Sequence, residues 1–321
     1  MRQYFIKIAG VALAGALVSA CGGHDDDDTG NLVEVAQANG FSALLAAATR
    51  AGLDDDLSAA SANGLTVFAP TNAAFTTLAT QLGFADANAM VAALPPSALA
   101  SILSYHVLPA RRTAADLTAG SATQATIYTY NAAPATLSLN TTSGVTITDA
   151  VLSSATVTTA NVEASNGVIH VVDKVLVPPG VLTVLQMAQA NPAAFSTLTG
   201  AVGAASLTTT LNDPSGTFTV FAPTNDAFAA IASTVAGLTV PQLQTVLTYH
   251  VLGSQVLSSG IPFGTPVATV AGQNITINAG TAPVIATITD TTVTPANIVA
   301  VDVRASNGVI HVINKVLLPT L

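Results

Sequence analysis

Histidine and tyrosine side chains are the groups in this chain with the clearest capacity for acid–base or metal chemistry. Six of them fall into two matching sets, Tyr105, His106 and His170 and then Tyr249, His250 and His311. A metal centre or a catalytic base needs convergent partners, usually carboxylates or thiolates. The acid that stands close in sequence is Asp173, three residues after His170, and Asn314 replaces it in the second set. We therefore expect these six side chains to be structural, with no metal, no cofactor and no catalytic role.

The single cysteine, Cys21, offers a different chemistry. It ends the segment LVSAC at 17–21, which resembles the lipobox of bacterial lipoproteins, where cleavage precedes a cysteine that is then acylated. The apolar run at 8–20 is too short to span a bilayer of about 30 Å and has the length of a signal-peptide core. We predict a signal peptide at 1–20 and lipid on Cys21 that anchors the mature protein to a membrane. An ordinary signal peptide with an incidental cysteine is the alternative.

The acidic segment that follows has no apolar periodicity, so we predict that residues 21–30 form a lipidated, flexible tether. His24 with Asp25 to Asp28 could bind a divalent cation weakly, but a solvated spacer is the simpler interpretation. The acidic run at 54–56 is likewise expected to be a solvated loop, because no calcium-loop spacing follows it. Similarity to known sorting signals favours the outer membrane, the periplasm or the cell surface of a bacterium.

Composition excludes some classes of partner. Half of the residues are hydrophobic, only 8% are charged and the net charge is −9, which indicates well-buried cores. Nucleic acid is not expected, because phosphate binding needs clustered basic side chains. The chain has no Trp and few aromatic residues, which argues against a platform for stacking sugars or bases.

An internal repeat organises the rest of the chain. LTVFAPTNAAF at 65–75 recurs as FTVFAPTNDAF at 218–228, LSYHVL at 103–108 recurs as LTYHVL at 247–252, and ASNGVIHVVDKVLVP at 164–178 recurs as ASNGVIHVINKVLLP at 305–319. The blocks keep their order, and each copy is far longer than the solenoid units of about 20–50 residues. We predict two tandem domains, at 31–179 and 180–321, whose short connection brings them into contact.

The first two blocks predict helices. In both copies a β-rich run ends at a proline, and the threonine that follows is a favourable helix N-cap. These pairs are Pro70-Thr71 and Pro223-Thr224. In the second block, apolar residues recur at helical spacing, and His106 and His250 continue the apolar face of each helix. Both histidines are therefore expected to be buried.

The third block predicts a β-hairpin. Its Asn-Gly pairs, at 166–167 and 307–308, are a strong signal for a two-residue turn. The strand that follows is apolar on both faces, so we expect it to be central and covered on both sides. Alternating Thr- and Val-rich stretches, such as 136–148 and 273–280, predict half-buried antiparallel strands. Each domain is thus predicted to be an α+β unit, with helices first, strands last and a sandwich-like core.

These three ordered blocks, present twice, resemble the signature elements of the fasciclin domain family, and they cover nearly all of residues 31–319. The resemblance implies that each domain is a seven-stranded, wedge-shaped β-sandwich with several helices. It also implies a role in adhesion or matrix binding, with other proteins, matrix or polysaccharide as partners. In animal relatives an Asp followed by an aliphatic residue, just before the last strand, is implicated in integrin contact.

The corresponding positions here are Asp302-Val303 in the second copy and Asn161-Val162 in the first. Because Asn161 lacks the carboxylate, the first copy departs from the family's pattern at this contact.

Three hypotheses about function follow. The leading one is a non-catalytic surface or envelope protein for adhesion. The alternative is an envelope protein that binds a small molecule, a lipid or a pigment, in an apolar pocket between sandwich and helices. The third is an enzyme acting on polysaccharide, which would need two nearby acids. It ranks last because each half has few acids to offer, and the chain also has no nucleophile elbow, phosphate loop or zinc-protease motif.

Overall fold

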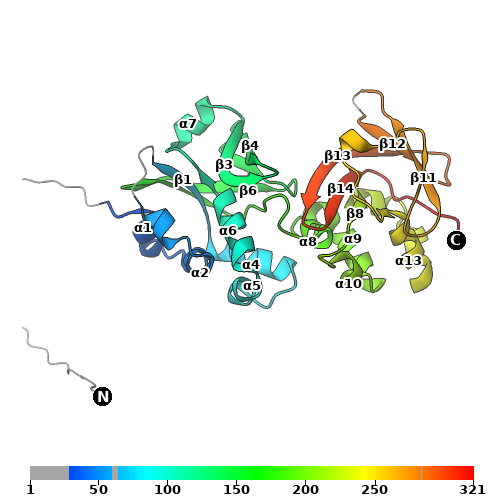
Figure 1. Ribbon diagram of the computed structural model, residues 1–321, viewed down its shortest axis with the longest axis horizontal. Helices are drawn as coiled ribbons and strands as arrows, with labels where there is room; N and C mark the ends of the chain where they lie inside the picture. The colour runs from blue at the N-terminus through cyan, green and yellow to red at the C-terminus, as the bar shows by residue number, and fades with distance from the viewer. Residues whose placement is uncertain (1–28, 60–63, 283) are drawn as a thin grey trace, which may run out of the picture.

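The computed structural model describes residues 29–59, 64–282 and 284–321, which form two similar halves arranged side by side (Figure 1). The predicted signal peptide at 1–20, Cys21 and the tether up to residue 28 lie outside the described residues. Each half contains one seven-stranded sheet, as expected, with helices packed against it.

The two sheets have the same number of strands. In the first half they are β1 Leu65–Pro70, β2 Val107–Leu108, β3 Thr123–Tyr130, β4 Ala133–Asn140, β5 Thr146–Thr148, β6 Ser154–Ala164 and β7 Gly167–Val172, in the order β2-β1-β7-β6-β5-β4-β3. In the second half they are β8 Phe218–Pro223, β9 Val251–Leu252, β10 Pro266–Ala268, β11 Asn274–Ala279, β12 Ala286–Thr289, β13 Ala296–Ala305 and β14 Gly308–Ile313, in the order β10-β11-β12-β13-β14-β8-β9.

The helices lie mostly in the first part of each half. Those of the first half are α1 Leu32–Ala38, α2 Ser42–Ala51, α3 Asp54–Ser58, α4 Asn72–Gln81, α5 Ala87–Ala93, α6 Pro96–Tyr105 and α7 Ala114–Ala119. Those of the second half are α8 Val184–Gln189, α9 Pro192–Ala204, α10 Thr208–Leu211, α11 Asn225–Ala229, α12 Ala232–Ala236, α13 Val240–Tyr249 and the 3₁₀ turn η1 Ser258–Gly260. Among the described residues no single helix has the length and hydropathy of a membrane span. Helices α5 and α6 pass such a test only as a pair bent by 117°.

Local sequence explains where several helices begin. The side chain of Thr71 accepts a hydrogen bond from the Ala74 N–H at the start of α4, and Thr224 does the same for Ala227 at the start of α11. Both predicted N-caps are therefore confirmed. The acidic run at 54–56 was expected to be a loop, and this prediction is wrong: it forms the first turn of α3, where the helix dipole favours negative charge.

The central strands β1 and β7 are covered on both faces, as predicted for β7. They pair in parallel, with Phe68 opposite His170, although they are far apart in sequence. Phe68 and Val172 point into a cluster between the two parts of the sheet. Ile169 and Val67 point the other way, into a second cluster under the helices. Each half therefore has a sandwich core and a helical core that share one pair of strands.

The predicted hairpin is present, but its turn lies one residue earlier than expected. Ala164 pairs with Gly167, so Ser165 and Asn166 are the turn residues. Gly167 is the first residue of β7. This position requires glycine, because a Cβ there would collide with the carbonyl oxygen of Leu65 on parallel β1. Gly308 has the same relation to β8 in the second half. The glycine thus allows the close approach of the parallel strand, and the asparagine forms part of the turn.

The Asn166 side chain ties the hairpin to the N-terminal helices. Its Oδ1 accepts a hydrogen bond from the Leu32 N–H at 2.9 Å, and its Nδ2 donates to the carbonyl oxygens of Leu57 and Ala59, both at 2.9 Å. Asn307 makes the same three bonds to residues of the second half. One buried amide in each half therefore fixes the first helix and the end of a later one onto the sheet.

The two halves touch, as their short connection predicts. The amide of Asn191, at the start of α9, is buried and donates to the Val151 carbonyl of the first half at 2.9 Å. The same amide also lies 3.4 Å from the carbonyl oxygen of Leu152 in the first half. The hydrophobic cluster beneath the helices is continuous across the two halves.

Candidate functional site

The two Tyr-His pairs lie at the C-terminal ends of α6 and α13, and their histidines are buried. His106 Nδ1 donates to the Ile102 carbonyl at 2.7 Å, and its Nε2 accepts from the Leu176 N–H at 2.8 Å. Because an N–H points at Nε2, the ring must be the neutral tautomer that carries its proton on Nδ1. The ring therefore connects the last turn of α6 to the segment after β7.

His250 repeats this arrangement in the second half. Its Nδ1 donates to the Val246 carbonyl at 2.8 Å, and its Nε2 accepts from the Leu317 N–H at 2.8 Å. Desolvation lowers the pKa of His106 and of His250 to about 4, against a partial opposing effect of the carbonyl acceptor. Both rings are therefore uncharged near neutral pH and have no free nitrogen for a metal or a substrate.

The second histidine of each half lies on the central strand. His170 Nε2 donates to the Arg112 carbonyl at 2.8 Å, and its Nδ1 faces the Asn161 N–H at 3.4 Å. His311 makes the corresponding contacts with Val256, at 2.9 Å, and Asp302, at 3.3 Å. Burial is the largest cause that lowers the pKa of both rings. These histidines therefore hold a loop and an adjacent strand in place.

The tyrosines of the pairs are core residues with one polar contact. The Tyr105 hydroxyl donates to the Thr136 carbonyl at 2.9 Å, and the Tyr249 hydroxyl donates to the Asn274 carbonyl at 2.9 Å. Desolvation raises the pKa of both hydroxyls. Each tyrosine thus links a helix to an outer strand of the sheet, and neither acts as an acid at neutral pH.

The positions suggested for partner contact, Asn161-Val162 and Asp302-Val303, lie at a β-bulge in β6 and in β13. Asn161 and Asp302 both adopt positive φ, 57° and 61°. The Asp302 carboxylate accepts bonds from the Ser258 N–H at 2.9 Å and its hydroxyl at 2.6 Å, whereas Asn161 Oδ1 accepts from the Ala114 N–H at 2.8 Å.

Exposure differs among these four residues. Asn161 is exposed, Val162 and Asp302 are half-buried, and Val303 is buried. Although burial opposes it, hydrogen bonding from Ser258 leaves the pKa of Asp302 below its usual range. The bulge is opposite the strand histidine in each half, so the backbone distortion and the histidine belong to one local arrangement.

Sequence reasoning missed a buried ion pair in each half. Asp149 bonds to Lys174 Nζ at 2.7 Å, and Asp290 bonds to Lys315 Nζ at 3.0 Å. Both carboxylates are fully buried and also accept backbone N–H groups, such as that of Val177 at 3.0 Å for Asp149. The repeated segment TITD, at 146–149 and 287–290, was the available signal. These pairs fix the segment that follows the last strand of each half.

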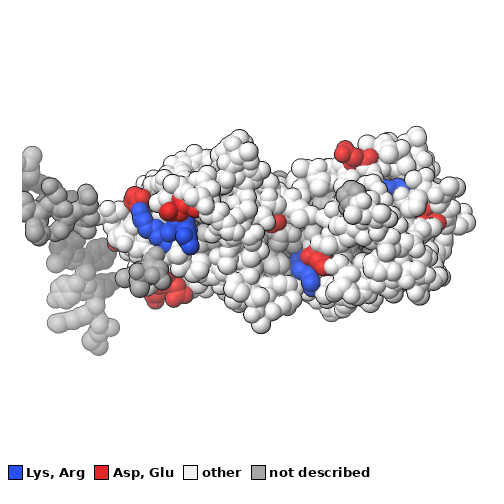
Figure 2. Space-filling view, turned by 90° about the horizontal axis from the view of Figure 1, so that it is seen from above, with Lys and Arg blue, Asp and Glu red and all other residues white. Residues whose placement is uncertain are grey.

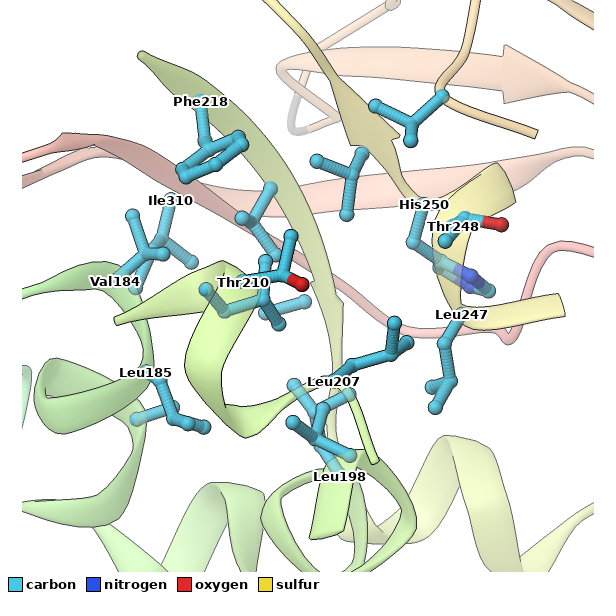
Figure 3. A pocket seen from close by; sticks show the side chains of 17 residues that line it. Val184, Leu185, Leu198, Leu207, Thr210, Phe218, Leu247, Thr248, His250 and Ile310 are labelled. Carbon is cyan, nitrogen blue, oxygen red and sulfur yellow. The ribbon is translucent and has the colours of Figure 1, made fainter. Parts of the chain in front are cut away.

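An apolar pocket lies between the helices and the sheet of the second half (Figure 3). Its volume is about 50 Å³, and side chains converge on it from α8, α9, α13, β8 and β14. They include Val184, Leu198, Phe218, Leu247 and Ile310. The first half has a similar pocket of about 30 Å³ at the equivalent place, bordered by His106 as this one is by His250.

Within the described part of the chain, no three His, Cys, Asp or Glu side chains converge as a metal site would require. The repeated histidines, tyrosines and carboxylates are each held by internal hydrogen bonds. This arrangement can stabilise a fold, but it presents no activated nucleophile or general base to a substrate.

Both halves of the chain are similar to known proteins. The family model of the fasciclin domain matches residues 39–178 and 193–319. Protein sll1483 of Synechocystis sp. is 42% identical over 145 residues, which are 44% of this chain and 75% of that protein. The transforming growth factor-beta-induced protein ig-h3 of Sus scrofa is 33% identical over 157 residues, 48% of this chain and 21% of that protein. A FAS1 domain pair from the insect cell adhesion molecule Fasciclin I aligns with 89% of this chain and 95% of that chain, with a TM-score of 0.44 and 20% identity.

Proposed function

Because this chain belongs to the fasciclin domain family, we propose that it is a non-catalytic binding protein of the bacterial envelope or cell surface, contributing to adhesion or matrix attachment. One observation carries the proposal: the four histidines of the repeated motifs are committed to internal hydrogen bonds in both halves. What remains for function is the exterior. No catalytic activity is part of the proposal.

The exterior supports binding through neutral polar contacts. Figure 2 shows a surface that is mostly uncharged, with charged side chains gathered in a few small groups. The chain has only 8 basic and 17 acidic residues. Such a surface favours hydrogen bonding over electrostatic attraction, which suits protein, matrix or polysaccharide partners and not nucleic acid.

The proposal includes an anchor and two binding units. Lipid on Cys21, after removal of residues 1–20, would hold the protein on the outer membrane, and residues 21–30 would space it from the surface. We propose that the units are residues 31–179 and 180–321. The bulges at Asn161-Val162 and Asp302-Val303 are the proposed partner contacts. Val303 is buried, so the contact there would fall to half-buried Asp302, and exposed Asn161 is the more accessible of the two polar side chains.

Solid-phase binding of the mature, lipid-free protein to whole cells, matrix proteins and exopolysaccharide tests the proposal. Saturable binding to at least one of them is expected. Asn161→Ala and Asp302→Asn should weaken binding if the bulges are contacts, whereas Asn88→Ala, an exposed change on α5, should not. Absence of saturable binding to all three materials would refute the adhesive role.

A second candidate function is transport or storage of a small apolar molecule, and the apolar lining of the paired pockets is the observation that motivates it. At about 50 and 30 Å³ the pockets are much smaller than the range of about 300–1,000 Å³ typical of ligand sites, so the helices would have to move apart to admit a lipid or pigment. Mass spectrometry of solvent extracts from protein purified out of its native envelope tests this candidate. A lipid or pigment present at one or two molecules per chain would support it, and an extract free of such molecules would count against it.

A further inference from the structure

A crevice of about 320 Å³ lies where the two halves meet, within the range of about 300–1,000 Å³ typical of ligand sites. We call it the junction crevice. It is bordered by Tyr105, Tyr130, Ser138, Thr148 and Asp149 of the first half and by Arg304 of the second. Its wall is as polar as it is apolar, unlike the pockets beneath the helices.

Neutral hydrogen-bonding groups face this crevice without internal partners. On β4 the side chains of Ala135, Leu137 and Leu139 are buried in the sandwich, so the alternation of the strand turns Thr136 and Ser138 outward. Within the described residues, the hydroxyls of Ser138 and Tyr130 make no hydrogen bond to protein. They are therefore available to a ligand that carries hydroxyl groups.

A half-buried aromatic side chain, Tyr130, lies at the edge of the crevice. The chain has five tyrosines, and two of them, Tyr105 and Tyr130, border the crevice. A third, Tyr128, lies edge-on to Tyr105 with 6.2 Å between ring centroids, and its hydroxyl donates to the Pro179 carbonyl at 3.0 Å. The ring of Tyr130 lies directly against Gly180, where no side chain intervenes. Tyr105 is buried, so the half-buried Tyr130 is the tyrosine that places part of a ring and a hydroxyl beside the crevice, a combination that suits a sugar ring.

Two charged residues border the crevice, Asp149 and Arg304. The Asp149 carboxylate is fully buried and neutralised by Lys174, and it also accepts three backbone N–H groups, so it is saturated. Arg304 is half-buried and takes part in none of the ion pairs found among the described residues, although Asp302 lies near it. A guanidinium with free donors binds a carboxylate through two parallel hydrogen bonds.

From these observations we propose that the junction crevice binds an acidic saccharide, with a uronate carboxylate on Arg304 and sugar hydroxyls on Ser138 and Tyr130. The assignment rests on the proposed surface-binding function, of which it names the ligand class. It requires both halves of the chain, because the cation comes from β13 and the hydroxyls from β3 and β4.

Calorimetric titration of the mature, lipid-free protein with a linear trimer of galacturonic acid tests the proposal. Saturable binding is expected, and Arg304→Gln should weaken it at least about tenfold, because the charged bidentate contact is lost. Tyr130→Phe should weaken it several-fold while leaving the fold intact. Arg112→Gln is the matched control, since Arg112 is exposed and does not border the crevice. Thermal unfolding of each variant confirms that it is folded.

Two further ligands separate charge from sugar recognition. A neutral galactose trimer should bind at least about tenfold more weakly than the acidic trimer, and so should tetraglutamate, which has carboxylates but no sugar hydroxyls. No saturable binding of the acidic trimer, unchanged affinity in Arg304→Gln, or equal binding of either comparison ligand would overturn the assignment. Titration does not depend on adhesion to cells, so failure of the solid-phase assay with retained trimer binding would refute the adhesive role alone.

Discussion

At the scale of single residues, the histidine of each Tyr-His pair connects a helix to the segment after the last strand. Its two hydrogen bonds require the neutral tautomer that carries the proton on Nδ1. Protonation of His106 or His250 would place an N–H on Nε2 against the N–H of Leu176 or Leu317. That conflict, together with desolvation, is the physical reason that their pKa values are low. Acid should therefore act on the fold through these rings.

We predict that stability falls as pH falls from about 6.5 to about 4. The pKa of each ring is about 4 when folded against 6.5 for the free side chain, so the unfolded chain binds more protons in this window. The loss is on the order of 3 kcal/mol for each histidine by pH 4. Urea unfolding at a series of pH values measures it. His250→Gln, which cannot titrate, should show a shallower slope, and an unchanged slope would contradict this explanation.

At the scale of elements, the buried asparagines of the hairpins fasten the helices to the sheet. Asn307 Oδ1 accepts from the Val184 N–H at 2.8 Å, and its Nδ2 donates to the carbonyls of Leu211 and Asp213 at 3.0 and 2.8 Å. Helices α8 and α10 are short, so they depend on tertiary contacts of this kind.

Asn307→Ala should therefore loosen α8 and α10 before it affects the sheet. The unpaired N–H of Val184 alone costs about 1–3 kcal/mol. Hydrogen–deuterium exchange should show faster exchange in α8 and near Leu211, with β14 changed little. Asn297→Ala on β13 is the control, because the Asn297 side chain makes no hydrogen bond within the described residues. Uniform loss of protection across the second half would show that the contact is not local.

At the scale of the whole molecule, the two halves are coupled by Asn191, whose counterpart in the first copy, Asn39, makes a different contact. The segment AQAN occurs at 36–39 and at 188–191. Asn39 is exposed and bonds within its own helix, to the Val35 carbonyl at 2.8 Å. Asn191 is buried and bonds to Val151 of the other half. The continuous helical cluster adds apolar contact across the same boundary.

Asn191→Ala should weaken the coupling between the halves, at a cost of about 1–3 kcal/mol for the unpaired Val151 carbonyl. Differential scanning calorimetry should show a broader transition, or two transitions, in place of the wild-type profile. Asn39→Ala removes the equivalent side chain from the exposed copy and should change the free energy of unfolding by less than about 0.5 kcal/mol. An identical effect of both variants would mean that the interface bond contributes nothing.

Local sequence patterns were sufficient to predict much of this fold. The caps at Thr71 and Thr224, the buried histidines at the ends of α6 and α13, the covered strand β7 and the family all follow from motifs that occur twice in order. These features depend on residues that are near one another in sequence, or on burial, which the periodic spacing of apolar residues indicates directly. The roles of Tyr105 and His106 as core residues could be inferred for the same reason.

Contacts between distant segments were decided by the tertiary structure alone. The parallel pairing of β1 with β7, the ion pairs of Asp149 and Asp290, and the bonds of Asp302 to Ser258 join residues whose separation carries no periodic signal. The scarcity of aromatic residues predicts no platform for stacking sugars, and the proposed saccharide contacts accordingly rest on hydrogen bonds from Arg304, Ser138 and Tyr130. Composition averages over the chain, whereas a binding site depends on which few side chains the fold brings together.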